Sequence, residues 1–179
     1  LISLIAFCPV LFSEIVIDGL LDEEEWATAR EINESMPSFA FFQIQSIISE
    51  NYPDLDRKPR VLILGCSYKP NIGDVRGSPI FELHSLLQEN DFETTCFDPY
   101  VSGDDVPNGF ILKKDMNEDK EIDLILLATA HREVLDINWT EMKSIMNKPI
   151  IYDGRRVLDI KSMESDGWLA YAVGRPINL

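Results

Sequence analysis

Basic residues are scarce in this sequence. Its 179 residues include 16 lysines and arginines but 31 aspartates and glutamates, which gives a formal net charge of −15 at neutral pH. A protein that binds nucleic acid needs a basic face for the phosphates, so this balance argues against nucleic acid as a partner. A smaller anion must then be held by a few local cations.

Cysteines and long apolar runs are also few. Cys8, Cys66 and Cys96 show neither disulfide nor metal-site spacing, and we interpret the last two as small apolar side chains at strands, in a reduced, cytoplasmic setting.

Residues Leu1–Phe12 lack the basic segment and cleavage site of a signal peptide. They are also too few to cross a bilayer, which takes roughly 20 residues, so no membrane partner is expected. The first residue is not Met, and we expect the chain to be part of a longer polypeptide.

The best-known catalytic and nucleotide-binding patterns are missing too. The sequence has neither the G-x-G-x-x-G dinucleotide fingerprint nor the G-x-x-x-x-G-K-[ST] P-loop. It also has no metal-site pattern, nucleophile elbow or pair of catalytic carboxylates. We therefore expect no metal, and we look for a ligand site of another kind.

From Arg60 onward, short apolar runs alternate with amphipathic segments, as in right-handed βαβ units. The sequence predicts an α/β fold, a Rossmann-like doubly wound parallel sheet with an N-terminal helical segment. Asp123–Ala128 has the continuous apolar character of a central strand. The expected strands are Arg60–Leu64, Glu93–Phe97, Phe110–Leu112, Asp123–Ala128, Pro149–Tyr152 and Trp168–Val173, and the expected helices are Ser78–Asn90 and Trp139–Met146.

Upstream of this alternation, Leu21–Glu50 is expected to form a helix that Pro37 kinks or restarts. The phenylalanines at 39, 41 and 42 give it more apolar surface than one helix buries. We therefore expect a homodimer through Trp26–Ile48. The expected division is an N-terminal apolar segment and helix (1–50), a proline-bounded linker (51–59) and a ligand-binding α/β domain (60–179).

Two loops at the expected carboxyl edge of the sheet contain candidate ligand-binding residues. In the loop Gly65–Pro79, Lys69 is either a phosphate donor or a solvated loop lysine, and its chemistry alone leaves these two interpretations even. In the loop Asp153–Arg156, the two arginines Arg155 and Arg156 either clamp a phosphate or stack on a base, or else the loop is a plain surface turn. Because both loops fall at one edge of an acidic protein, we favour binding.

Other polar residues near these loops have simpler interpretations. Asp74 and Arg76 favour a local ion pair or helix cap. Asp98 stands where dinucleotide folds place a ribose-binding acid, but the following proline favours a turn. His131 could act as a general base, but no partner acid is identifiable, which favours a structural role.

Four motifs resemble the C-terminal, UDP-binding domain of the UDP-glucose/GDP-mannose dehydrogenase family. They are GCSYKPNIGDVRGSP, CFDPYV, DLILLATAHRE and IIYDGRRVLD, in the family's order and spacing, and upstream ATAREINESMP resembles the family's long dimer-interface helix. The resemblance covers Trp26 to the end of the chain. The phrase Ala-His-Arg-Glu is most similar to family members that act on N-acetylated UDP-hexosamines.

The resemblance implies an enzyme that oxidises the C6 hydroxyl of a nucleotide sugar to a carboxylate, with NAD⁺ as cofactor and a cysteine thiohemiacetal. It implies that Tyr68 and Lys69 hold the UDP portion of a UDP-sugar, that Arg155 contacts the nucleotide sugar, and that Arg76 reaches an NAD site across a domain interface. The family's glycine-rich NAD domain and glycine-flanked catalytic cysteine have no counterpart in this sequence, and Cys8 receives no catalytic role. We therefore expect the chain alone to be inactive. The alternative is a non-catalytic nucleotide-sugar-binding or dimerisation module that works with a separate catalytic half.

Overall fold

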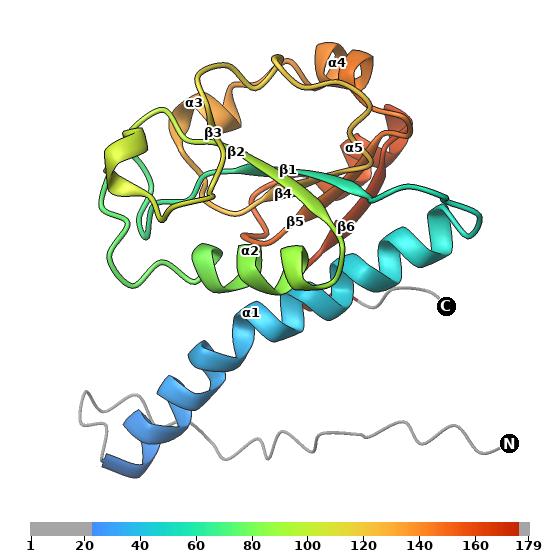
Figure 1. Cartoon of the computed structure of the whole chain (residues 1–179). Helices are drawn as coiled ribbons and strands as arrows, with labels where there is room; N and C mark the ends of the chain where they lie inside the picture. The colour runs from blue at the N-terminus through green and yellow to red at the C-terminus, as the bar shows by residue number, and fades with distance from the viewer. Residues whose placement is uncertain (1–22, 176–179) are drawn as a thin grey trace, which may run out of the picture. The chain divides into compact units, whose positions relative to one another are not determined.

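A computed structural model describes residues 23–175 of the chain (Figure 1). In this range, six parallel strands form one sheet in the order β3-β2-β1-β4-β5-β6, which is the doubly wound order of a Rossmann-like fold. The predicted fold class is confirmed. The strands are β1 (Arg60–Leu64), β2 (Glu93–Phe97), β3 (Leu112–Lys113), β4 (Leu124–Leu127), β5 (Ile150–Asp153) and β6 (Leu169–Ala172).

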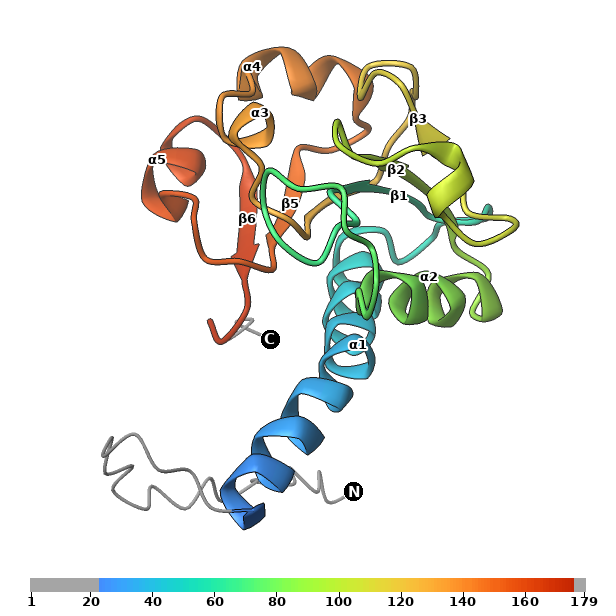
Figure 2. The same ribbon diagram turned by 90° about the vertical axis from the view of Figure 1, so that its left-hand side faces the viewer.

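The central strands are buried on both faces because helices cover each side of the sheet. On one side, Val61 and Ile63 of β1 pack in a core with α1 (Glu23–Asn51) and α2 (Ile80–Glu89). On the other side, Leu62 and Leu64 pack in a second core with α3 (Arg132–Leu135), α4 (Trp139–Met142) and α5 (Ile160–Ser165). Figure 2, turned by 90°, shows the same separation of α2 from α3 and α4. Two 3₁₀ turns, η1 (Gly103–Asp105) and η2 (Lys143–Ile145), complete the elements.

The strand expected at Phe110–Leu112 begins slightly later, because Phe110 turns into the core and pairing with β2 starts at Ile111. The carbonyl of Ile111 accepts from the Cys96 N–H at 2.9 Å. The helix expected at Trp139–Met146 is α4 followed by η2. The boundaries of the expected strands and of the helix after β1 therefore move by one or two residues. The sequence pattern does not predict α3, α5 or η1, each of six residues or fewer.

The compact unit that contains the sheet begins at Glu34, within α1. Pro37 is expected from the sequence to kink or restart the helix, but the helix runs through it without a break, so Pro37 does not restart it. The backbone hydrogen bond that proline removes is offset by apolar packing in the following turns, where Phe41, Ile44 and Ile47 are buried. Trp26 and the other side chains before Glu31 lie outside the described part of the structure, as do Leu21 and Cys8.

The segment between α1 and β1 is fastened to the sheet by a bidentate ion pair. The Arg57 guanidinium donates to both carboxylate oxygens of the buried Asp123, at 2.7 and 2.9 Å. The same carboxylate accepts from the backbone N–H of Arg60 at 2.9 Å. Burial raises the pKa of Asp123, but these charged and backbone donors outweigh it and the net shift is downward. The first strand is therefore held in register at its amino end.

No helix in residues 23–175 is long and apolar enough to span a membrane.

Candidate functional site

The strand order reverses between β1 and β4, and we use the word crevice for the switch point at the carboxyl ends of these two strands. The chain leaves β1 toward β2 on one side and leaves β4 toward β5 on the other, and α/β sheets bind ligands where the order reverses in this way. The loops that follow β1 (65–79), β4 (128–131) and β5 (154–159) meet at this edge. Both candidate loops from the sequence are among them.

Asp98, at the end of β2, organises the start of the loop after β1. Its Oδ2 accepts from the backbone N–H groups of Cys66 at 2.8 Å and Ser67 at 2.9 Å. Its Oδ1 accepts from the Tyr100 N–H at 3.0 Å, which is the turn predicted for this residue. Only 4% of Asp98 is exposed. Burial raises the pKa of its carboxyl, but the hydrogen bonds from His131 and the backbone more than compensate and bring the pKa down to about 2.

His131 is fully buried and contacts Asp98, with Nε2 lying 3.0 Å from Oδ2. His131 therefore has a partner acid, which is not identifiable from the sequence alone. Sequence reasoning missed the pair because the two residues stand 33 positions apart, after different strands. The available signal was that both follow parallel strands of one sheet, whose carboxyl ends meet at the same edge.

The loops after β1 and β5 are both attached to the loop after β4. The Thr129 hydroxyl donates to the Ser67 carbonyl at 2.7 Å. The Arg155 Nε donates to the carbonyl of Ala128, and the Gly154 N–H donates to the carbonyl of Leu127 at 3.0 Å. Ala128 and Thr129 are consecutive, so the two candidate loops lie on either side of one short stretch of backbone.

Two glycines allow this close approach. Gly65 has a φ of +89°, and a Cβ on it would lie 2.4 Å from the Thr129 Cβ. Gly73 has no positive φ, but a Cβ there would lie 2.1 Å from the carbonyl oxygen of Tyr100. The loop after β1 therefore requires the absence of a side chain at both positions.

The expected ligand-binding side chains are presented to solvent from this fixed backbone. Tyr68 is 48% exposed, and Lys69 and Arg155 are also exposed. Within residues 23–175, neither Lys69 nor Arg155 forms an ion pair with a carboxylate. In the described structure, no carboxylate ion pair therefore neutralises Lys69 or Arg155 at the carboxyl edge of the sheet.

Arg76 is engaged differently. Its Nε and a terminal nitrogen each donate to Asp74 at 2.8 Å, so the predicted local ion pair is confirmed. The pair holds the pKa of Asp74 at about 2. The Arg76 side chain is 88% exposed and faces away from the packed core, before the start of α2.

The crevice does not fit NAD in the manner of a Rossmann domain. The loop after β1 lacks the repeated glycines that cradle a pyrophosphate. Asp98, in the place of the ribose-binding acid, has both carboxylate oxygens filled by backbone N–H groups and His131. A dinucleotide would find no free acceptor there.

The described cysteines are not placed as nucleophiles. Cys66 and Cys96 are buried and unpaired by disulfide, as expected for apolar side chains. Burial, followed by contact with Cys66, raises the pKa of the Cys96 thiol, which disfavours the thiolate. Residues 23–175 also hold no cluster of His, Cys, Asp and Glu suited to a metal ion.

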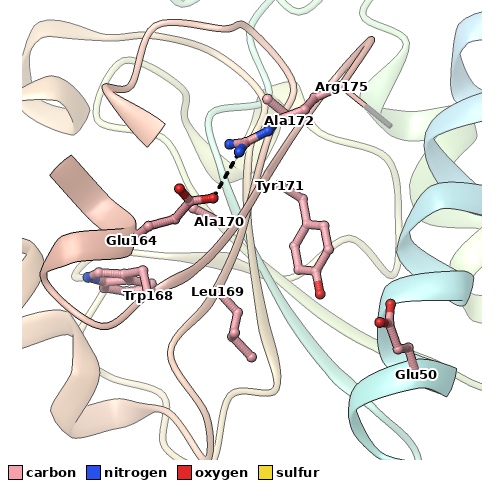
Figure 3. A pocket seen from close by; sticks show the side chains of 8 residues that line it. All are labelled: Glu50, Glu164, Trp168, Leu169, Ala170, Tyr171, Ala172 and Arg175. Carbon is pink, nitrogen blue, oxygen red and sulfur yellow. Dashed lines mark ion pairs between the residues drawn. The ribbon is translucent and has the colours of Figure 1, made fainter. Parts of the chain in front are cut away.

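A hollow of about 200 Å³ beside β6 is a poor alternative site for an anion (Figure 3). Its two carboxylates, Glu50 and Glu164, outnumber its single cation, Arg175. That cation is already paired with Glu164 at 3.0 Å. The hollow lies along the edge strand, and neither Lys69 nor Arg155 lines it.

The α/β domain is similar in sequence to known proteins. Residues 62–160 match the model of the UDP-glucose/GDP-mannose dehydrogenase family, UDP binding domain. The chain belongs to this family. The matched range includes the three loops of the crevice, and the chain therefore contains the family's UDP-binding domain.

Individual relatives show the same relationship. The chain is 31% identical to a UDP-glucose 6-dehydrogenase of Rickettsia conorii, over 81% of this chain and 34% of the relative. It is 32% identical to a UDP-N-acetyl-D-mannosamine dehydrogenase of Methanocaldococcus jannaschii, over 82% and 33%. The solved structure of a UDP-D-ManNAc dehydrogenase from Pyrococcus horikoshii superposes with a TM-score of 0.68 at 26% identity, covering 88% of this chain and 35% of that one. The chain thus spans about a third of the length of these relatives.

Proposed function

We propose that this chain binds the UDP portion of a UDP-sugar at the carboxyl edge of the sheet, with Lys69, Tyr68 and Arg155 as the contacting residues. Lys69 supplies a compact charge for the diphosphate. Tyr68 supplies an exposed aromatic face beside it. Arg155 supplies a planar guanidinium whose two terminal nitrogens are left for the nucleotide sugar, because its Nε donates to the carbonyl of Ala128.

The single observation that carries this proposal is the attachment of both cationic loops to Ala128 and Thr129. Thr129 holds the loop of Lys69 through Ser67, and Ala128 accepts from Arg155 directly. Two cations without carboxylate partners in the described structure thus flank the switch point of a protein with a net charge of −15. Local binding of one anionic ligand accounts for this arrangement.

We also propose that the chain is part of an NAD-dependent UDP-sugar 6-dehydrogenase. The names of the relatives and the family match support this assignment. NAD is proposed to be held mainly by residues other than this α/β domain, with the exposed Arg76 facing it. Because the sequence has neither the family's glycine-rich NAD loop nor its glycine-flanked cysteine, the chain alone is proposed to bind UDP without oxidising a sugar. A module that works with a separately encoded catalytic half has the same binding site and the same expected inactivity.

The homodimer is proposed from the exposed apolar face of α1. Phe41 is buried against the core, with its ring centroid 6.4 Å from that of Phe92. Phe39 is 42% exposed and Phe42 is 60% exposed. A second copy covering these two rings would remove them from water.

Calorimetric titration of the full chain with UDP tests the binding proposal. We expect saturable binding that weakens as salt is added, because a few cations supply most of the attraction. An assay with NAD⁺ and UDP-sugars is expected to show no NADH. Absence of UDP binding at millimolar concentration would contradict the proposed function, and turnover by the chain alone would contradict its proposed inactivity.

A further inference from the structure

We propose that His131 is a positioning residue for UDP binding: its neutral ring, protonated at Nε2, holds the backbone on both sides of the Lys69–Pro70 bond. This inference rests on the proposed function and assigns a role to a residue that does not itself touch the ligand.

The position of the ring proton follows from those partners. Nδ1 accepts from the backbone N–H of Asn71 at 2.9 Å, so Nδ1 has no room for a proton of its own. The proton of the neutral ring therefore sits on Nε2. From there it is shared between Asp98 Oδ2 and Ser67 Oγ, each 3.0 Å away. The unprotonated nitrogen, Nδ1, already accepts from the Asn71 N–H, so the ring is not available as a general base.

The network continues from Ser67 into the binding loop. The Ser67 hydroxyl accepts from the ring and donates its own proton to the carbonyl of Lys69, at 3.2 Å. His131 thus acts on the carbonyl of Lys69 through Ser67, and on the N–H of Asn71 directly. Every donor in this chain of contacts has an acceptor, which is the condition for a buried polar network to be rigid.

Further contacts hold the loop after β1 in place around the His131 ring. The side chain of Asn71 accepts from the Arg132 N–H at 2.9 Å, and the Tyr68 N–H donates to the carbonyl of Asp74 at 2.8 Å. Tyr100 covers the imidazole, with the ring centroids 5.0 Å apart. The exposed side chains of Tyr68 and Lys69 therefore project from a backbone that is ordered before any ligand arrives. Such preorganisation reduces the entropy lost on binding.

Two substitutions of His131 remove the contacts of one ring nitrogen at a time. In His131→Asn, the amide oxygen stands near the place of Nδ1 and can still accept from Asn71. The contacts of Nε2 with the buried Asp98 and with Ser67 are lost, and with Ser67 the link to the Lys69 carbonyl. In His131→Gln, the amide nitrogen stands near the place of Nε2 and can still donate to Asp98, but the acceptor for Asn71 is lost. His84→Gln is a matched control, because His84 is also buried and contacts Thr94 at 2.6 Å, on α2 and outside the three loops.

The experiment measures UDP affinity by calorimetry and Tm by calorimetric melting for the full chain and the three variants. A positioning role predicts that both His131 variants bind UDP more weakly than wild type, roughly tenfold or worse, because each releases one of the two backbone groups that the ring holds. His131→Asn should have the lower Tm of the two, because it also loses the contact with the buried Asp98. His84→Gln should lower Tm and leave the affinity unchanged. If both His131 variants keep wild-type affinity, or if His84→Gln weakens UDP binding as much as they do, the positioning role is wrong.

Wild-type measurements keep the inference testable even where a variant fails to fold. Long-range ¹H–¹⁵N spectra should show the His131 ring protonated at Nε2 only, and the Asn71 amide should exchange slowly with solvent in the absence of UDP. A proton on Nδ1, or fast exchange at Asn71, would overturn the inference while leaving UDP binding itself intact. Failure of wild type to bind UDP would instead contradict the proposed function, and the positioning role with it.

Discussion

Asp98 and His131 are in contact, with a carboxylate oxygen 3.0 Å from a ring nitrogen and neither side chain exposed to solvent. The carboxylate also accepts three backbone N–H groups from two loops. An ionised acceptor with this many donors is held strongly, because each charged hydrogen bond is worth roughly 1.5–3 kcal/mol. The pair therefore joins the ends of β2 and β4 to the loop after β1.

Asp98→Asn should destabilise the protein by about 2–4 kcal/mol at neutral pH. Both carboxylate oxygens of Asp98 accept hydrogen bonds, and the substitution replaces one of them by an amide nitrogen that can only donate. Urea unfolding measures the effect. Asp104→Asn is the matched control: Asp104 is exposed in η1, and the same change should alter stability by less than about 0.5 kcal/mol. Equal effects of the two substitutions would show that the Asp98 network contributes nothing.

The contribution of Asp98 should also depend on pH. Its pKa is about 2 in the folded protein against 3.8 in the ordinary range, so the unfolded chain binds the proton first as pH falls. The stability that ionised Asp98 confers is complete above about pH 4 and is lost between about pH 4 and pH 2. The difference between wild type and Asp98→Asn should shrink across this window. A difference that stays constant would contradict the low pKa.

Gly65→Ala should cost more than about 3 kcal/mol and weaken UDP binding. The new Cβ would add a collision with Thr129 to the cost of a positive φ. Gly77→Ala provides the control, because Gly77 also has a positive φ, +69°, but nothing lies within 4 Å of its Cβ position. That variant should lose only about 1 kcal/mol. Urea unfolding of both variants separates backbone strain from the close approach of the loops.

His84 should make stability fall as the solution becomes mildly acidic. Burial lowers the pKa of His84 below its usual 6.5. Below about pH 6.5 the unfolded chain therefore takes up a proton that the folded protein resists, and unfolding is favoured. Between pH 7.5 and pH 5, wild type should lose more stability than His84→Gln in urea unfolding. Parallel curves for the two proteins would show that His84 titrates alike in both states.

The proposed dimer depends on two exposed rings of α1. Replacing Phe39 and Phe42 together by serine should convert a dimer into a monomer in sedimentation velocity, because both rings lie on the solvent side of the helix. Phe41→Ser is the contrasting variant. Phe41 is buried against Phe92, so its loss should lower Tm instead. A wild-type chain that is monomeric at all accessible concentrations would contradict the dimer proposal.

The fold was largely predictable from the sequence because a buried parallel strand is a short, continuous apolar run. Val61–Leu64 and Leu124–Leu127 are such runs, and the alternation around them specifies βαβ units. The uninterrupted helix at Pro37 was not predictable, since it depends on tertiary packing of Phe41, Ile44 and Ile47 that a local rule does not include.

The candidate site was predictable in part. Lys69 and Arg155 follow strands, so their placement at one edge is a consequence of the parallel sheet. The Asp98–His131 pair was missed because side-chain partners across loops depend on strand order, and the sequence does not state that β1 lies between β2 and β4. Because β1 lies between β2 and β4, the residues that follow β2 and β4 lie on either side of the loop after β1. Asp98 and His131 are such residues, and they contact each other there.

The most direct test of the account is calorimetric titration of the full chain with UDP, comparing wild type with Lys69→Ala, Arg155→Ala and Lys161→Ala. Lys161 is an exposed lysine of α5, and its removal changes the net charge by the same amount. We predict that Lys69→Ala and Arg155→Ala each abolish measurable binding or weaken it at least roughly tenfold, while Lys161→Ala binds as wild type does. Unchanged affinity in both Lys69→Ala and Arg155→Ala would contradict the assignment of UDP to this crevice.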